Sequence, residues 1–380
     1  MLTLYIFFAL LYGGLLFYLR QIWWHKIPEV DLESPSIPVT LILPIRNEAH
    51  HLPLLFQEIE SLVYPDLEVI LVDDHSEDGG AALIQSRENE ALKVPIQYLL
   101  NEGTGKKQAL ETGIFKAKGE VIVQSDADCR WPDHWISGLL AGFGECKTMM
   151  VAGPVMSLPK PGFFATFQQI EWGSILLLSH FFFYKKSPLM CSGANLAYRK
   201  AAFLKVGGFE GNREWLSGDD AFLLTKIAAT FGPESIIYQT SKSQLVHTEP
   251  SPDWGAYLSQ RIRWAGKWRH PENKSKAWAA MGTFGIQIVF LSSFALPFFG
   301  KAAAMVFIFL WGIKCLAEKQ VLGLVLEDMG FKFKLLDYLK ASFLHPIYAI
   351  RVGLSTLGKE VEWKGRKGHT TNIKYPKENV

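Results

Sequence analysis

Two kinds of hydrophobic pattern divide the chain: long apolar blocks near its ends and short apolar runs between them. Residues 1–19 and 281–299 contain no charged side chain, and each nearly reaches the ~20 apolar residues that a helix needs to cross a bilayer. No basic stretch precedes the first block, and no small-residue cleavage site follows it, so it is typical of an uncleaved anchor rather than a signal peptide. The pattern therefore predicts an N-terminal transmembrane anchor over residues 1–20.

A C-terminal membrane region is predicted over residues 279–356. Residues 302–317 follow the second apolar block after a short break, which predicts a hairpin of two helices. Residues 339–356 are apolar but contain a histidine, a proline and an arginine, so this stretch either spans the membrane or lies along its surface. The predicted number of spans is therefore three or four.

Basic residues near the apolar blocks predict the orientation of the chain, because lysine and arginine favour the cytoplasmic side of a membrane. Such residues flank the central region at both ends: Arg20, Lys26, Lys267, Arg269, Lys274 and Lys276. We therefore expect an integral protein of a bacterial inner membrane, with its central region in the cytoplasm. Residues 357–380 form a basic tail. Placing this tail in the cytoplasm as well requires an odd number of spans and favours three.

The central region predicts a parallel sheet that is covered by helices on both faces. Apolar runs rich in branched residues, typical of strands buried on both faces, alternate with helical stretches. This alternation predicts an α/β domain, which we place at residues 37–270. The runs are residues 37–45, 67–74, 95–100 and 119–128, and the helical stretches are residues 51–62, 78–90 and 104–117.

Acidic residues follow three of the predicted strands, at the sheet edge where parallel sheets bind their ligands. They are Glu48, Asp73, Asp74, Asp126 and Asp128. Carboxylates gathered at one edge repel one another unless a cation or a donor compensates them. Asp126 and Asp128 lie two residues apart, so both can face one ion, and their hard oxygen ligands suit Mg²⁺ or Mn²⁺. His247 is a further candidate ligand, although a lone histidine is more often packed or solvated.

Composition changes this picture little. The net charge of +2 is small and unevenly distributed, and we expect no nucleic-acid partner. The four cysteines show neither a CxxC pair nor metal-ligand spacing, which argues against a disulfide framework and against a structural zinc site. Reduced thiols in a cytoplasmic compartment are the simplest interpretation.

Four motifs occur in the order that is typical of family 2 glycosyltransferases, and the chain resembles the membrane-bound members of that family. The motifs are LILPIRNE with VDDHS, SDAD at residues 125–128, SGDD at residues 217–220 and QRIRW at residues 260–264. The resemblance covers roughly residues 38–270. It implies the GT-A fold, which is Rossmann-like with a mostly parallel sheet, together with flanking transmembrane α-helices. It also implies a nucleotide-sugar donor and a divalent metal.

The resemblance implies roles for the matching residues. Asp220 would be the general base that deprotonates the acceptor, and Asp219, where many relatives have glutamate, is the alternative. Asp128 would bind the metal, and Asp126 would contact the metal or the ribose. The residues expected around the nucleotide are Pro44, Arg46, Glu48, Asp74 and either Lys106 or Lys107.

The QRIRW motif lies on a predicted helix that a serine–proline pair opens. At helical spacing Gln260, Arg263 and Trp264 share a face, whereas Arg261 points elsewhere. The resemblance assigns the first three to the active site, where a guanidinium can neutralise a leaving diphosphate and an indole can stack on a sugar. Without the resemblance, a juxtamembrane helix that is anchored at the headgroups fits equally well.

We therefore expect an inverting, metal-dependent glycosyltransferase that moves a sugar from a UDP-sugar to a membrane lipid or a lipid-linked glycan. Residues 174–184, next to Trp172, either receive such a lipid or belong to the core. Two alternatives stay open: a processive synthase of a β-linked polysaccharide, in which QxxRW also occurs, and a catalytically silent membrane scaffold. The retained acidic positions argue against the scaffold.

Overall fold

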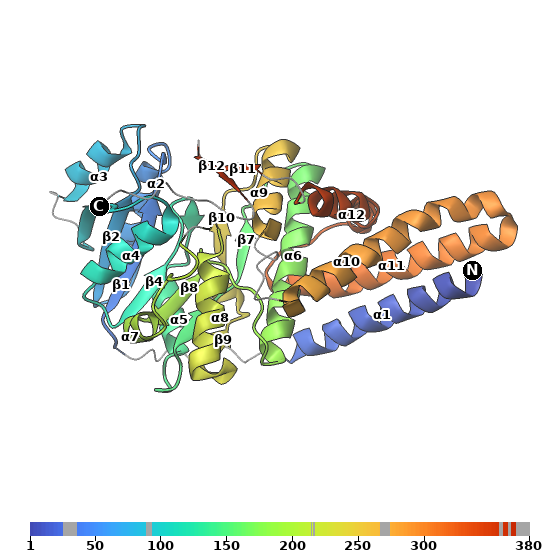
Figure 1. Cartoon of the computed structure of the whole chain (residues 1–380), viewed down its shortest axis with the longest axis horizontal. Coiled ribbons are helices and arrows are strands. Elements are labelled where there is room, and N and C mark those ends of the chain that lie inside the picture. The colour runs from blue at the N-terminus through green and yellow to red at the C-terminus, as the bar shows by residue number, and fades with distance from the viewer. Residues whose placement is uncertain are drawn as a thin grey trace.

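The computed structural model describes residues 1–25, 36–88, 93–213, 215, 217–266, 274–356, 360–363 and 366–369. Figure 1 shows an α/β body from which an arm of long helices projects. Three of the basic residues used to predict the orientation, Lys26, Lys267 and Arg269, lie outside the described residues. Within the predicted basic tail, the structure describes an antiparallel pair, β11 (Glu360–Trp363) and β12 (Arg366–His369).

A seven-stranded sheet forms the centre of the body. Across the sheet the strands are β3 (Ile96–Leu100), β2 (Leu67–Asp73), β1 (Val39–Ile45), β4 (Val121–Gln124), β8 (Leu196–Arg199), β6 (Met150–Ala152) and β9 (Ile236–Tyr238). Strands β3, β2, β1 and β4 are parallel to one another, and β6 is parallel to β9. Strand β8 runs against both of its neighbours. The predicted α/β class with a mostly parallel sheet is therefore confirmed.

The alternation of side chains along the strands explains why helices cover both faces of the sheet. On β1, Leu41 and Leu43 are fully buried in one apolar cluster, whereas Ile42 between them is fully buried in another. The first cluster includes α2 (Leu52–Ser61), α3 (Gly80–Glu88), α5 (Trp135–Ala141) and α6 (Phe163–Tyr184). The second includes α4 (Lys106–Lys116), α7 (Lys200–Lys205) and α8 (Asp219–Phe231).

The carboxyl ends of the first strands meet at one edge of the sheet. In the strand register Ile45 pairs with Asp73, and Asp73 pairs with Leu100. Strand β4 stops at Gln124, although the run that predicted it continues to residue 128. The chain turns there because the Ser125 hydroxyl donates to the Ala194 carbonyl at 2.6 Å. A second, three-stranded sheet follows this turn, with β5 (Cys129–Arg130), β10 (Val246–Thr248) and β7 (Val155–Ser157).

The arm contains α1 (Leu2–Trp24), α10 (Lys274–Ser292), a 3₁₀ segment (Ser293–Phe299) and α11 (Lys301–Asp328), and α12 (Leu335–Ser355) lies near its base (Figure 1). By length and composition, Leu2–Trp24 and Met281–Phe299 could cross a membrane. The predicted helix at residues 302–317 continues as α11 to Asp328. The three-span topology stays a prediction.

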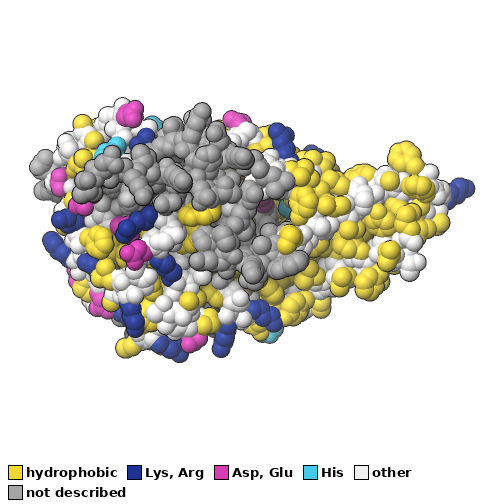
Figure 2. Space-filling view, in the orientation of Figure 1, with side chains coloured by type: hydrophobic (Ala, Val, Ile, Leu, Met, Phe, Trp, Pro, Cys, Tyr) yellow, Lys and Arg dark blue, Asp and Glu magenta, His cyan; other side chains and the backbone are white. Residues whose placement is uncertain are grey.

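Apolar side chains cover most of the arm's visible face (Figure 2). Phe298 is 88% exposed, Ile308 69% and Phe7 65%. A contiguous apolar surface on a soluble protein marks contact with a membrane or with another protein. This surface therefore fits the apolar blocks from which the membrane segments were predicted.

A buried ion pair lies inside the arm. Lys314 is fully buried and pairs with Glu318, one turn further along α11. The Tyr12 hydroxyl of α1 donates to Glu318 at 2.6 Å, and Ser342 of α12 donates to the same carboxylate. Because a buried charge without a partner is costly, this network favours one registry of the three helices.

Candidate active site

The SDAD motif forms the turn that leaves β4. Its serine is held in place from two sides, since Trp131 Nε1 also donates to the Ser125 hydroxyl, at 2.8 Å. Beyond it, Asp126 and Asp128 are both partly exposed. One ligand atom from each of Asp126, Asp128 and Cys129 lies within 4.8 Å of the others. The turn thus brings the two predicted metal ligands together.

Cys129 was not predicted from the sequence, and its chemistry makes it the weakest member of this group. Burial raises the pKa of the Cys129 thiol, and the carboxylates of Asp128 and Asp126 raise it further. A protonated thiol is a poor metal ligand, because the thiolate is the species that binds. The two carboxylates are therefore the better donors. Asp128 also accepts a hydrogen bond from the Thr248 hydroxyl at 3.1 Å, which links the turn to β10.

Lys106 joins the SDAD turn to the SGDD motif. Its ammonium lies 2.6 Å from Asp126 Oδ1 and 3.4 Å from Asp219 Oδ2. Burial lowers the pKa of Lys106, but Asp126 and Asp219 outweigh burial and leave that pKa above its ordinary value. Gln124, at the end of β4, donates to Asp219 Oδ2 at 2.7 Å. A permanent cation thus lies between two carboxylates that are distant in the chain.

The two aspartates of the SGDD motif differ in their surroundings. Both lie in the first turn of α8, after Gly218, whose φ of 90° suits a glycine. Asp219 is buried against Lys106 and Gln124. Asp220 is partly exposed and accepts from the backbone N–H of Gly193 at 3.3 Å. Asp220 is therefore the more accessible carboxylate.

Arg263 of α9 (Trp254–Gly266) faces the same group of carboxylates. Burial lowers the pKa of the Arg263 guanidinium, while Asp126, Asp219 and Asp220 raise it. The helix is fastened to the SGDD loop, because the Ser217 hydroxyl donates to the Arg263 carbonyl at 3.2 Å. Gln260, one turn before Arg263 on α9, is partly exposed. Lys106 and Arg263 thus lie among three of the site's carboxylates, those of Asp126, Asp219 and Asp220.

Trp264, which helical spacing groups with Gln260 and Arg263, also contacts Trp172 and Arg261. Its ring packs edge-on against Trp172 of α6, with 5.6 Å between centroids, and the Arg261 guanidinium lies 4.3 Å from its centroid. Arg261 itself donates to Glu171 at 2.8 Å and is almost fully buried. Arg261 therefore points away from the acidic site, as expected, and Trp264 packs with it. Trp172 belongs to the core.

Asp74 organises the loop that leads to Lys106. The Asp74 carboxylate is buried and accepts from Asn101 Nδ2 at 2.8 Å and from the Gly105 N–H at 2.9 Å. Arg46 Nη1 donates to the backbone carbonyl of Asp74 at 2.7 Å. Two of the predicted nucleoside residues, Arg46 and Asp74, thus share one network at the ends of β1 and β2. Pro44, in β1, is partly exposed beside them, and Glu48 follows in the next turn.

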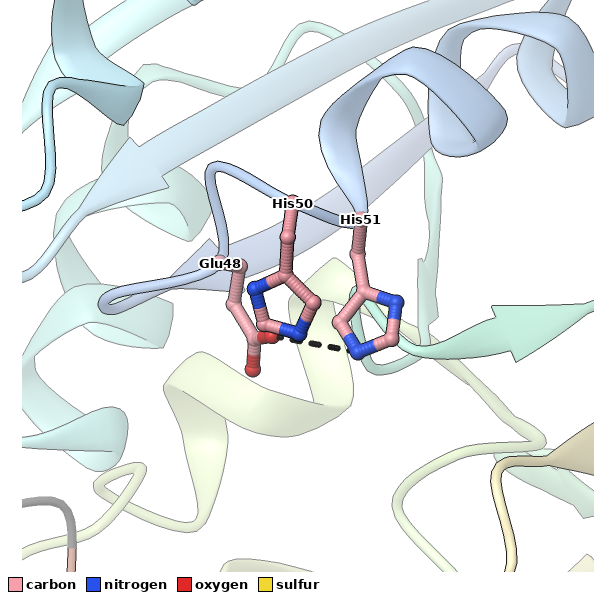
Figure 3. A group of neighbouring side chains, drawn as sticks. All are labelled: Glu48, His50 and His51. Atoms are coloured by element: carbon pink, nitrogen blue, oxygen red, sulfur yellow. Dashed lines mark ion pairs between the residues drawn. The ribbon is translucent and has the colours of Figure 1, made fainter.

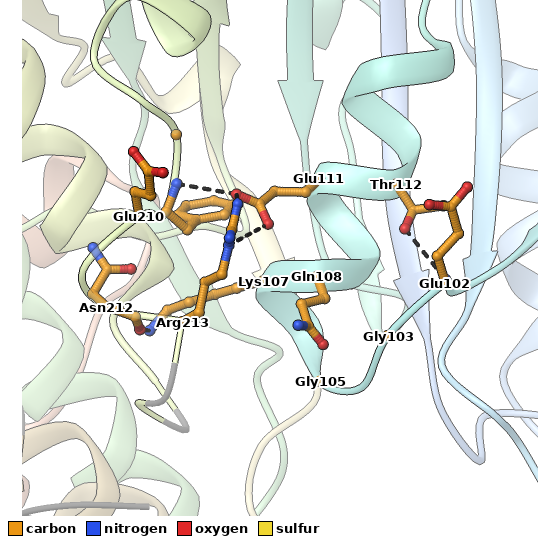
Figure 4. A network of polar contacts seen from close by, with 12 residues as sticks. Glu102, Gly103, Gly105, Lys107, Gln108, Glu111, Thr112, Glu210, Asn212 and Arg213 are labelled. Carbon is orange, nitrogen blue, oxygen red and sulfur yellow. Dashed lines mark hydrogen bonds and ion pairs between the residues drawn. The ribbon is translucent and has the colours of Figure 1, made fainter. Parts of the chain in front are cut away.

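Lys106 and Lys107, which the sequence did not separate, have different environments. Lys107 is buried, and its ammonium donates to the backbone carbonyl of Asn212 at 2.7 Å (Figure 4). It also donates to the carbonyls of Trp215 at 2.9 Å and Ser217 at 3.2 Å. Lys107 therefore fastens the loop that leads into the SGDD motif.

One turn after Lys107 along α4, Glu111 holds the same loop. It pairs with Arg213, whose Nε lies 2.9 Å from Glu111 Oε2 (Figure 4). Lys106 is thus the lysine that lies among the site carboxylates.

His247 lies apart from the SDAD carboxylates. Its neighbour Thr248 contacts Asp128, and successive residues of a strand point to opposite faces. The His247 ring accordingly packs against Phe331, with 6.1 Å between ring centroids. Around the SDAD turn, the residues that the structure brings together as possible metal ligands are thus Asp126, Asp128 and Cys129.

Comparison with known proteins identifies relatives for part of the chain. Residues 40–207 match the family model described as glycosyl transferase family 2. An undecaprenyl-phosphate 4-deoxy-4-formamido-L-arabinose transferase of Yersinia enterocolitica is 34% identical over 113 residues, which are 29% of this chain and 35% of that protein. The enzyme of the same name from Pseudomonas fluorescens is 31% identical over 106 residues, which are 27% and 31% of the two chains. The chain thus spans about a third of the length of these curated relatives.

A solved structure resembles almost the whole chain. It is the mannosyltransferase PcManGT from Pyrobaculum calidifontis in complex with GDP-Man and Mn²⁺. The two chains share 20% sequence identity and a TM-score of 0.55, and the match covers 94% of this chain and 96% of that one. At this identity the likeness establishes the fold alone.

Proposed function

As the chain is a family 2 glycosyltransferase, we propose that it is an inverting enzyme which transfers a sugar from a UDP-sugar to a lipid or a lipid-linked glycan at the cytoplasmic face of a membrane. The apolar arm, with two segments that could span a bilayer, supports a lipid acceptor. The names of the relatives, which act on undecaprenyl phosphate, support it too. The GDP-Man bound to the mannosyltransferase of similar fold supports a nucleotide-sugar as the class of donor.

The observation that carries the proposal is the mixed-charge cluster at the sheet edge. Asp126, Asp219 and Asp220 come from two segments that are distant in the chain, and Lys106 lies within ion-pair distance of two of them. A nucleotide diphosphate is an anion that needs fixed cations, and Lys106 and Arg263 would supply them. The Asp220 carboxylate is partly exposed, so an acceptor can reach it.

The SDAD carboxylates fit a hard divalent cation. Asp126 and Asp128 present oxygen ligands at adjoining positions, and burial raises the pKa of the neighbouring Cys129 thiol. Mg²⁺ or Mn²⁺ held by these two residues would neutralise charge on the donor diphosphate. A contribution from His247 has less support, because its ring packs against Phe331.

The chain's own residues would divide the transfer step between them. Asp220 accepts the proton of an acceptor hydroxyl while that oxygen forms its bond to the anomeric carbon. The bond from this carbon to the diphosphate oxygen breaks, and the nucleoside diphosphate leaves with the electron pair. Lys106 and Arg263 stabilise the negative charge that develops on the leaving group. Asp219, buried against Lys106, holds that ammonium in place.

The group that attacks the sugar could also be a lipid phosphate rather than a hydroxyl, and the names of the curated relatives favour the phosphate. A phosphate monoester is largely ionised at neutral pH, so its oxygen attacks without losing a proton to a base. The two acceptors therefore make opposite demands on Asp220. Asp220→Asn should nearly abolish transfer to a hydroxyl and should affect transfer to a lipid phosphate only modestly.

The proposal is tested with the full chain in detergent, a panel of nucleotide-sugars, a membrane lipid extract and Mn²⁺ or Mg²⁺. We expect transfer that depends on the metal and is lost in Asp128→Ala, while the variant stays folded. Asp133→Ala is the matched control, because Asp133 is an exposed aspartate near the same turn. Full activity of Asp128→Ala would contradict the metal role. A ladder of products in place of one added sugar would identify a processive synthase instead.

A further inference from the structure

A second group of side chains with metal-ligand chemistry lies in the turn between β1 and α2 (Figure 3). One ligand atom from each of Glu48, His50 and His51 lies within 4.8 Å of the others. His51 Nε2 is 3.7 Å from Glu48 Oε2, and the two imidazole centroids are 3.9 Å apart. Glu48 is only 13% exposed. Two imidazoles and a carboxylate are thus gathered at one point of the surface.

The local fold explains why these three side chains meet. The His51 N–H donates to the Glu48 carbonyl at 2.8 Å, which closes a turn and places residues 48 and 51 on one side. The loop after β2 holds the backbone of this turn at two further points. The Asn47 N–H donates to the Ser76 hydroxyl at 3.0 Å, and the Ala49 N–H donates to Asp78 Oδ2 at 2.7 Å. The ligand-bearing backbone is therefore fixed independently of any ion, which favours binding.

The ligand types indicate which ions would bind. Imidazole nitrogen with one carboxylate suits Zn²⁺, Co²⁺, Ni²⁺ and Cu²⁺, whereas Mg²⁺ requires oxygen ligands. Zinc bonds of ~2.0–2.2 Å in a tetrahedron put neighbouring ligand atoms roughly 3.4 Å apart. The separation of 3.7 Å between His51 Nε2 and Glu48 Oε2 is close to this spacing. The SDAD turn, with two carboxylates, has the opposite preference.

We propose that Glu48, His50 and His51 bind a transition-metal ion of the zinc type, and that this ion competes with the donor nucleoside for Glu48. The competition rests on the proposed function, because it requires the loop after β1 to line the nucleoside pocket. The binding site itself does not depend on it. Zinc-type ions would then inhibit an enzyme that uses Mg²⁺ or Mn²⁺ at its other metal site.

The binding is tested by calorimetric titration of Co²⁺ or Zn²⁺ into the full chain in detergent, without a histidine tag. The background is the double variant Asp126→Asn/Asp128→Asn, so that the SDAD turn does not bind the probe. We expect one equivalent of ion to bind in the presence of excess Mg²⁺. His50→Gln and His51→Gln should each weaken binding by at least about tenfold. The control is His134→Gln, which changes an exposed histidine outside the cluster. Equal affinities in all three variants would overturn the site.

The competition is tested by measuring nucleotide-sugar binding with and without Zn²⁺ at constant Mg²⁺, with both SDAD aspartates intact. Zn²⁺ should weaken donor binding by about tenfold in His134→Gln and much less in His50→Gln. The same effect of Zn²⁺ in both variants would overturn the competition. Absence of donor binding even without Zn²⁺ would contradict the proposed function, whereas the titration with metal alone would still decide the site.

Discussion

The two faces of α9 carry arginines only two residues apart, in opposite surroundings. On one face, Arg261 lies against Glu171, with its guanidinium between the rings of Tyr257 and Trp264. On the other face, Arg263 is close to three aspartates, of which Asp126 and Asp220 are partly exposed. The first arginine is enclosed by aromatic rings and one carboxylate. Arg263 lies near three carboxylates, and its single positive charge cannot neutralise all of them.

The difference teaches how one helix can serve both stability and chemistry. The Glu171 carboxylate accepts from Arg261, Tyr257 and Tyr348, so it joins α6, α9 and α12. Glu171 is only 12% exposed and already accepts from three donors, so its role is to hold the fold together. On the site face, Asp126, Asp128 and Asp220 are partly exposed, so that a metal or an acceptor can approach them. The Arg261 face of α9 is thus held against α6 and α12, while the Arg263 face carries the proposed chemistry.

The largest expected effect belongs to the site face. Asp220→Asn removes the proposed base but keeps the size of the side chain, so donor binding should persist. Turnover with a hydroxyl acceptor should fall by about 10²- to 10⁴-fold, the usual contribution of a positioned base. The measurement is single-turnover transfer at saturating donor, beside a donor-binding titration. Asp133→Asn serves as control, and an Asp220→Asn enzyme with normal turnover on a hydroxyl acceptor would remove Asp220 from this role.

Substitutions on the Arg261 face of α9 should lower the stability of the fold. Glu171→Ala leaves Arg261 buried without its carboxylate, and breaking a buried pair in this way costs about 3 kcal/mol or more. The thermal unfolding midpoint in detergent should therefore drop clearly. Glu249→Ala is the comparison, because Glu249 pairs with Lys160 near the surface at 2.9 Å and such pairs contribute little. Similar midpoints for the two variants would contradict the distinction between the faces.

Lys106 and Lys107 on α4 show the same contrast between a site residue and a residue that stabilises the fold. Lys107→Met removes a charged donor from three backbone carbonyls, which should lower the free energy of unfolding by about 2 kcal/mol. Lys106→Met should leave the unfolding midpoint closer to that of the parent and should weaken donor binding instead. Thermal unfolding and donor titration of both variants provide the test. The idea fails if both variants lose donor affinity to the same degree with unchanged midpoints.

Much of the α/β body was predictable because β1, β2 and β4 are largely apolar runs that are almost entirely buried. Strands β6 and β9 were missed, since three-residue runs such as Met150–Ala152 show no periodicity. The reversed direction of β8 is also invisible in sequence, because it depends on pairing with β4 and β6. The confirmed part of the fold is therefore the part that local burial determines.

At the site, the sequence brought the right segments together but did not determine where each side chain points. Lys106 and Lys107 are neighbours on a helix, where one residue turns the side chain by about 100°, and only packing against the Asn212 loop separates them. Trp264 is four residues from Gln260 and three from Arg261, so helical spacing allowed either face. In the structure, the Trp264 ring packs against Trp172. In the turn after β1, the sequence predicted a role for Glu48 alone and none for His50 or His51.

The smallest effect is expected from His247, which lies on neither face of α9. Burial lowers the pKa of His247, so the folded protein binds fewer protons there than the unfolded chain does just below the ordinary histidine pKa of ~6.5. The free energy of unfolding should therefore fall as pH drops below about 6.5, and His247→Gln should make that decline shallower. Exposed His134 supplies the control variant, His134→Gln, whose pH profile should match the parent.

Because the His247 ring packs on Phe331 rather than beside Asp128, His247→Gln should leave metal-dependent turnover almost unchanged. A large loss of turnover in His247→Gln with an unchanged pH profile would instead indicate that His247 belongs to the metal site. The proposed chemistry would then include a residue of β10.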